Sequence, residues 1–169
     1  QGGGYDVVRR ALVAALLAID GLGPRTVLTE TLTESFLAPA PTRLGAAAQA
    51  LPPREVAARV PLVAVAAAAG DEVARRILHE AGEALAKLAF AAARSAGLAG
   101  PLDVAVGGSV LLHVAPVREA LAATLRAAAA EINVRVLSSH AAALGAAWLA
   151  HGHTNGRSPQ REWVAHGAL

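Results

Sequence analysis

The chain of 169 residues contains no cysteine and no methionine, and only 3% of its residues are aromatic. Without cysteine, the chain has no disulfide, no thiolate nucleophile and no cysteine-held metal cluster of its own. Hydrophobic residues make up 54% of the chain, but many of them are alanines, which favour helix and bury little area each. The composition therefore predicts a globular, helix-rich protein with a core of small aliphatic side chains.

The chain also has a small net charge and only short apolar runs. Fifteen Lys and Arg against thirteen Asp and Glu give a formal net charge of +2. Nucleic-acid-binding proteins concentrate positive charge on one face, whereas here the basic residues are scattered, so we predict no nucleic-acid partner. The longest strongly apolar run, Val60 to Ala69, is too short to span a bilayer, and no signal segment opens the chain. We therefore expect no membrane partner and a cytoplasmic location.

The chain begins on Gln1 and three glycines rather than on methionine, and we interpret it as a piece of a longer protein. Its length is that of one domain, which we take to be partial. We divide it into a mainly helical part over residues 1–101, a βα-βα part over 102–150 and a polar tail over 152–169.

Apolar residues at helical spacing predict helices through most of the first hundred residues. The predicted ranges are 7–19, 26–36, 44–51, 52–69 and 71–95. Asp6 and Asp71 are predicted N-caps, and Pro61 should bend or divide its helix because proline removes a backbone hydrogen bond. With Asp20 assigned to a turn and Asp103 to the start of a strand, we identify no catalytic carboxylate.

The stretch from Leu102 to His113 is the one around which the rest is organised. An apolar run formed by Leu102, Val104, Ala105 and Val106 meets Gly107-Gly108-Ser109. This pattern predicts a strand that is covered on both faces, as in a parallel sheet, and ends in a glycine turn. A helix over 116–130 and an alternating strand over 132–136 complete a βαβ unit. Ligands bind at the carboxyl ends of such strands, although a simple tight turn is the alternative.

Three segments resemble a known family. VAVGGSVLLH (104–113) and SSHAAALGAAWLA (138–150) resemble the end of N-acetylglucosamine kinases of the BadF/BadG/BcrA/BcrD ATPase group, within the actin-like ATPase superfamily, and residues 4–24 are more weakly similar. The resemblance implies an α/β fold: the helix-rich C-terminal portion of an actin-like, ribonuclease H-like ATPase domain, with the βαβ unit at about 102–136 and flanking helices. It places the first strands and the N-terminal domain upstream of Gln1.

The resemblance also implies an ATP site. Gly107, Gly108 and Ser109 match the family's adenosine motif, His113 matches a position that reaches the nucleotide, and Ala58 matches a small residue packed against the base. ATP and Mg²⁺ are the implied cofactors, with Mg²⁺ and the catalytic base held upstream. We assign no catalytic, sugar-binding or metal-binding residue to this chain.

The implied function is the adenosine-binding part of a kinase that transfers phosphate from MgATP to the 6-hydroxyl of N-acetylglucosamine or glucosamine. A homodimer is a further expectation, because the resembled kinases often pair. One alternative is a helical partner-binding module without activity. Another is an ATPase that activates a second enzyme, although such activators hold an iron–sulfur cluster through cysteines that this chain lacks.

Several further residues that could belong to a functional site also have a purely structural interpretation. Ala58 is equally well explained as an ordinary helical alanine, and His140 as a helix cap or a partly exposed side chain rather than a ligand contact. His151 and His153, with His166 nearby, have no cysteine or carboxylate at ligand spacing, so we predict a solvated tail there rather than a zinc site. A last helix is predicted over 140–151.

Overall fold

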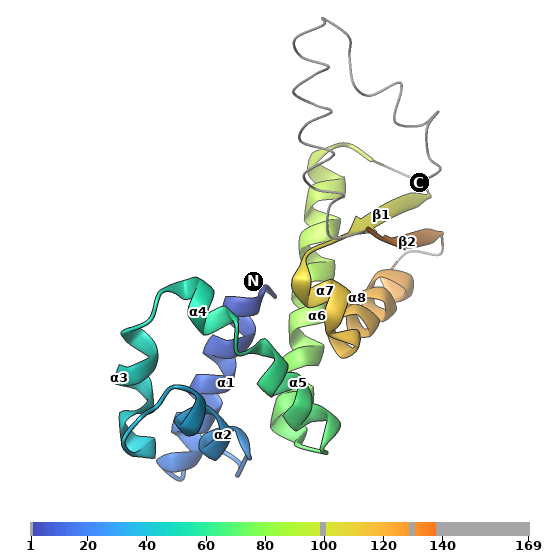
Figure 1. Ribbon diagram of the computed structural model, residues 1–169. Coiled ribbons are helices and arrows are strands. Elements are labelled where there is room, and N and C mark those ends of the chain that lie inside the picture. The colour runs from blue at the N-terminus through green and yellow to red at the C-terminus, as the bar shows by residue number, and fades with distance from the viewer. Residues whose placement is uncertain (1, 99–100, 129–130, 138–169) are drawn as a thin grey trace, which may run out of the picture.

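The computed structural model describes residues 2–98, 101–128 and 131–137 (Figure 1). The elements in chain order are α1 (Gly4–Ile19), α2 (Leu28–Ser35), the 3₁₀ helix η1 (Pro41–Arg43), α3 (Leu44–Gln49), α4 (Pro53–Ala57), α5 (Val60–Ala68), α6 (Glu72–Ser95), β1 (Leu102–Val106), α7 (Ser109–His113), α8 (Ala115–Ala128) and β2 (Ile132–Val136). The chain is mixed α/β and rich in helix, as the sequence predicts. The helix predicted over 140–151 and the tail lie outside the described residues.

Helix α1 packs against α2, α4, α5 and α6. Its fully buried residues recur at helical spacing: Val7, Val8, Ala11 and Ala15. The helix ends where the Leu22 N–H donates to the Leu17 carbonyl at 2.8 Å, a bond that satisfies one of the free carbonyls of the last turn. The predicted helix and its end are confirmed.

The prediction that Asp6 is the N-cap of this helix is wrong. Gly3 is the N-cap, and Asp6 lies within the first turn. Its carboxylate reaches back to accept the N–H of Gly2, one residue before the N-cap, at 3.0 Å, whereas a capping box bonds the N–H of the N-cap residue itself. The carboxylate still satisfies a free N–H at the helix start, but from inside the helix.

The single helix predicted over 52–69 is two helices, α4 and α5, with Ala58 and Arg59 between them. Pro61 lies in the first turn of α5, where a residue without an N–H loses no helical bond. Proline therefore divides the predicted helix, as expected. The helices predicted over 26–36 and 44–51 are confirmed in shortened form as α2 and α3.

Helix α6 is the longest element described, and Asp71 caps it as predicted. The Asp71 carboxylate accepts the Ala74 N–H of α6, the Thr26 hydroxyl and the Val27 N–H, each at 2.8 Å. Burial acts to raise the pKa of Asp71, but these hydrogen bonds outweigh it and leave the pKa below its ordinary value. One carboxylate thus ties the start of α6 to the start of α2.

The most extensive helix–helix contact in the described part joins α6 and α8 (Figure 1). At its centre is Gly82, which is buried. A Cβ at Gly82 would lie 2.6 Å from the Ala120 Cβ and 2.8 Å from the Leu121 backbone nitrogen, and would overlap the Val117 carbonyl oxygen. The absence of a side chain at Gly82 therefore allows the two helices to cross at close range.

Strands β1 and β2 pair in parallel, with Leu102 opposite Ile132 and Val106 opposite Val136. The chain passes from one to the other through α7 and α8, which confirms the predicted βαβ unit. The prediction that β1 is covered on both faces is wrong: Asp103 and Ala105 are exposed. Asp103 lies on the open face because burying a carboxylate without compensation is costly. There its carboxylate accepts a hydrogen bond from the Asn133 side-chain amide at 2.9 Å.

Candidate functional site

The predicted glycine turn lies at the carboxyl end of β1. Gly107, Gly108 and Ser109 are all exposed. Gly108 has φ 92° and ψ 153°, a conformation that is essentially restricted to glycine. A Cβ on Gly108 would meet no atom within 4 Å. The turn therefore presents an open stretch of bare backbone to the surface, at the end of the strand where α/β sheets bind ligands.

Helix α7 follows this turn directly and carries two polar side chains of the candidate site. Ser109 is its first residue and His113 its last. They are four residues apart, so they lie on one side of the helix, and both are exposed. Leu111, between them, is buried and anchors the opposite side. The structure thus brings Ser109 and His113 together beside the glycine backbone.

Ala58 belongs to a different segment, which reaches α7 through the start of α1. A Cβ at Gly4 would lie 3.4 Å from the Ala57 Cβ, 3.3 Å from Val60 Cγ2 and 3.5 Å from Val110 Cγ2. The junction of α4 and α5 and the first turn of α7 therefore meet around Gly4. Ala58 follows Ala57 and is exposed, so it lies at the surface next to this meeting point.

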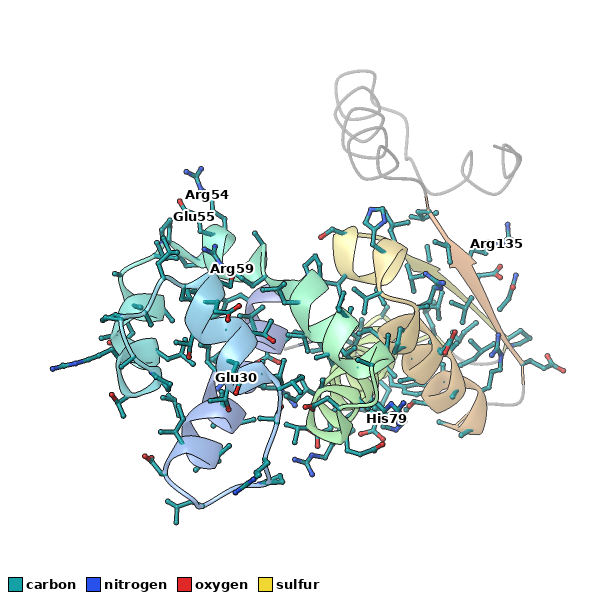
Figure 2. All side chains as sticks on the ribbon, turned by 60° about the horizontal axis from the view of Figure 1, so that its bottom comes forward. Glu30, Arg54, Glu55, Arg59, His79 and Arg135 are labelled. Atoms are coloured by element: carbon teal, nitrogen blue, oxygen red, sulfur yellow. The ribbon has the colours of Figure 1, made fainter. Side chains whose placement is uncertain are left out.

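The next residue, Arg59, fixes the α4–α5 junction. Its guanidinium lies 4.7 Å from the centroid of the Phe36 ring, a cation–π distance, and it donates to the carbonyls of Glu55 and Ser35. Figure 2 shows Arg54, Glu55 and Arg59 gathered at this end of the molecule, with Arg135 of β2 at the opposite end. The exposed position of Ala58 is therefore held by its neighbour.

An ion-pair network holds the glycine-rich segment before α1. Arg10 donates to Asp6 at 3.0 Å and to Glu80 of α6 at 3.1 Å, while Gly2 is buried against Leu85. Burial acts to raise the pKa of Asp6, but the Gly2 hydrogen bond and the charges of Arg9 and Arg10 outweigh it and lower the pKa to about 2. Asp6 is therefore a charged structural anchor throughout the neutral range.

Two contacts at the candidate site escape sequence analysis. Arg118 of α8 donates to the carbonyls of Leu111 and Leu112, at 2.9 and 3.2 Å, and so contacts the end of α7. Gly4 is the point around which α4, α5 and α7 meet. No sequence signal separates Arg118 from other helix arginines, or Gly4 from the glycines beside it, because both roles depend on which segments approach them.

A shallow hollow lies elsewhere, at the amino ends of the two strands, where it is lined by Leu102, Asp103, Ile132 and Asn133 among others. This is the opposite end of the sheet from the glycine turn. Because ligands of open α/β sheets bind beyond the carboxyl ends of the strands, we regard the glycine turn as the better candidate.

Other candidate residues fall outside this site. The described residues contain no group of three or more His, Asp or Glu side chains placed to hold a metal ion. His140, His151, His153 and His166 lie outside the part of the chain that the structure describes. None of the helices described combines the length and the apolar character needed to cross a membrane.

Comparison with known proteins shows that this chain belongs to a class of ATPases. The chain is a member of the BadF/BadG/BcrA/BcrD ATPase family, whose sequence model matches residues 1–150. A search of curated proteins returns no match. The match covers most of the chain, and it includes the glycine turn, α7 and the junction at Ala58.

Proposed function

We propose that this chain is the adenosine-binding part of an ATP-dependent kinase, and that the nucleoside lies against Gly107 and Gly108. The observation that carries this proposal is the backbone at Gly108, which is exposed, has a conformation reserved for glycine and has open space where a side chain would stand. A planar ring can approach such a backbone closely because no Cβ intervenes. Membership of an ATPase family supports the choice of ATP.

The side chains around the turn fit a nucleoside. Ser109 provides a hydroxyl, and His113 an imidazole, on the exposed side of α7; both groups can hydrogen-bond a ribose or an adenine. Ala58 contributes a small apolar surface for the base. Bound MgATP supplies the phosphoryl group that is transferred, while the residues of this chain bind and orient the nucleoside. No described residue is proposed as a catalytic base or a Mg²⁺ ligand.

The proposed acceptor is the 6-hydroxyl of N-acetylglucosamine or glucosamine. This choice is supported by the resemblance of residues 104–113 and 138–150 to N-acetylglucosamine kinases. An ATPase that activates a second enzyme is the remaining alternative; this chain has no cysteine to hold its iron–sulfur cluster, and the cluster's ligands would have to lie upstream. A cytoplasmic location, where MgATP is available, and pairing into a homodimer follow as parts of the same proposal.

The kinetic test is Gly108→Val in the full-length enzyme, assayed for phosphorylation of N-acetylglucosamine and glucosamine. Valine at this φ is strained and stands where the nucleoside would lie, so the Michaelis constant for ATP should rise by tenfold or more, about 1.4 kcal/mol. Gly97→Val is the matched control, since Gly97 also has a positive φ, of 66°, with nothing within 4 Å of its Cβ position. An ATP Michaelis constant unchanged in Gly108→Val would contradict the proposal.

One observation favours the second candidate, a partner-binding module. The described sheet has only two strands, and a sheet of two strands is marginal unless something packs on it. Such a module predicts a well-folded protein that binds neither ATP nor adenosine. Nucleotide titration separates the two candidates.

A further inference from the structure

Helix α7 has little to stabilise it from within. It spans five residues, and its N-cap, Gly108, makes no side-chain capping bond. Helices shorter than about 12 residues are marginal in isolation, so α7 depends on its surroundings for its conformation. Because Ser109 and His113 begin and end this helix, their relative orientation depends on the same contacts.

Arg118 supplies a contact at the C-terminal end of α7. One of its guanidinium nitrogens, Nη1, donates to the Leu111 and Leu112 carbonyls at 2.9 and 3.2 Å. The last carbonyls of a helix have no partner within the helix, and a positive charge is favourable at this end. Arg118 is partly buried and belongs to α8, which packs along α6. The side chain therefore fastens a short, weak helix to a well-anchored one.

We propose that Arg118 is a positioning residue for the nucleotide site. It holds the end of α7 and so fixes the orientation of Ser109 and His113 toward the bound nucleoside. This inference rests on the proposed adenosine site. Arg118 contacts the backbone carbonyls of α7 rather than the ligand. Its loss should therefore weaken MgATP binding indirectly, through α7. The turnover number at saturating MgATP and the Michaelis constant for the sugar should stay close to wild type.

The experiment compares three variants of the full-length protein. Arg118→Met removes the donors and keeps the aliphatic stem, and Arg118→Lys keeps a positive donor without the guanidinium fork. Arg126→Met is the control, because Arg126 is on the same helix but exposed. We expect the MgATP dissociation constant to rise about tenfold in Arg118→Met, less than the full loss of two hydrogen bonds to a charged donor, because these bonds hold α7 rather than the ligand. Arg118→Lys should recover part of the loss, and Arg126→Met should match wild type.

Amide hydrogen exchange over residues 109–113 provides the second readout. Exchange there should quicken in Arg118→Met together with the loss of MgATP affinity. Faster exchange with unchanged affinity would overturn the positioning role, and so would equal losses in Arg118→Met and Arg126→Met. If Arg118→Met fails to fold, Arg118→Lys decides. A raised MgATP dissociation constant with faster exchange over residues 109–113 in Arg118→Lys supports the positioning role, whereas wild-type MgATP affinity and wild-type exchange mean that Arg118 is purely structural. If the wild-type protein binds no MgATP, the proposed function itself fails, a result distinct from unchanged affinity in a variant of a binding protein.

Discussion

The helical part of the molecule (residues 2–98) and the sheet part (101–137) are built on different principles. In the helical part, several side chains are completely buried: Val7, Val8, Leu28, Leu32, Leu44, Val63 and Leu78. In the sheet part, Val106 is the one buried residue among the described strand residues, and Val136 is 51% exposed. The completely buried side chains of this part are in α8: Val117 and Leu125.

This contrast shows which part of the fold holds the candidate site in place. The strands are covered on one face, while α8 is anchored on α6 through Gly82. Helix α7 lies between the two and is fastened to α8 by Arg118. The glycine turn thus lies where a well-buried helical framework meets a thinly covered sheet, and its residues are free to contact a ligand.

The largest expected effect tests the contrast directly. Leu28→Ala leaves a cavity in a completely buried position and should lower the free energy of unfolding by about 3 kcal/mol. Val134→Ala, in the partly buried strand β2, should lower it by about 1 kcal/mol or less. Urea denaturation of both variants measures the difference, and equal losses would contradict the contrast.

The joint between the two parts is tested by Gly82→Ala. Its new methyl group would overlap backbone atoms of α8, so we expect a loss of about 2 to 3 kcal/mol and faster amide exchange across α8. Gly45→Ala is the control: its Cβ would meet Leu16 Cδ1 at an ordinary 3.6 Å inside α3, and helix propensity predicts a small gain. A Gly82→Ala variant as stable as wild type would show that the helices do not depend on this close crossing.

The anchor at the start of α1 predicts a pH dependence within the helical part. The pKa of Asp6 is lowered from 3.8 to about 2, so its stabilising effect is present above pH 4 and is lost as the pH falls through 2. Asp6→Asn should lower stability by about 1 kcal/mol at pH 7, after allowance for solvent screening. The gap to wild type should close between pH 4 and 2. Asp20→Asn, at an exposed position, is the control, and a pH-independent gap for Asp6→Asn would refute the ion-pair account.

The smallest effect concerns one strained residue in the helical part. Leu37 follows the C-cap residue of α2; it has φ 51° and is 89% exposed, so it adopts a left-handed conformation without packing that would compensate for the strain. Leu37→Gly should raise the free energy of unfolding by about 0.5 to 1 kcal/mol, seen as a higher melting temperature. Leu22→Gly, which removes an exposed leucine with negative φ, should give no gain. Equal shifts would mean that exposure, rather than strain, explains the effect.

Sequence patterns predict what depends on neighbours along the chain. The Asp71 cap, the division at Pro61 and the glycine turn after β1 are examples, because capping, proline geometry and strand alternation act over a few residues. The candidate site residues Ser109 and His113 lie together for the same reason, since both are on the short helix α7.

The features that escape prediction depend on distant segments. Gly82 is critical only because α8 crosses there, and Asp6 accepts from Gly2 because Arg10 and Glu80 hold that end of α1 against α6. The one-sided cover of β1 also escapes prediction, because an apolar run does not show that Asp103 is exposed. The role of Arg118 depends on where α7 ends, which its own side chain helps to determine.

The most direct test of the central claim is calorimetric titration of the protein with ATP and with adenosine, accompanied by thermal melting with each ligand. We expect that both ligands bind, that adenosine retains much of the affinity of ATP, and that each raises the melting temperature by mass action. We further expect Gly108→Val to weaken the binding of both ligands by about tenfold or more and to reduce both melting shifts, while Gly97→Val keeps them. A folded protein that binds neither ligand would contradict the account and favour a partner-binding module.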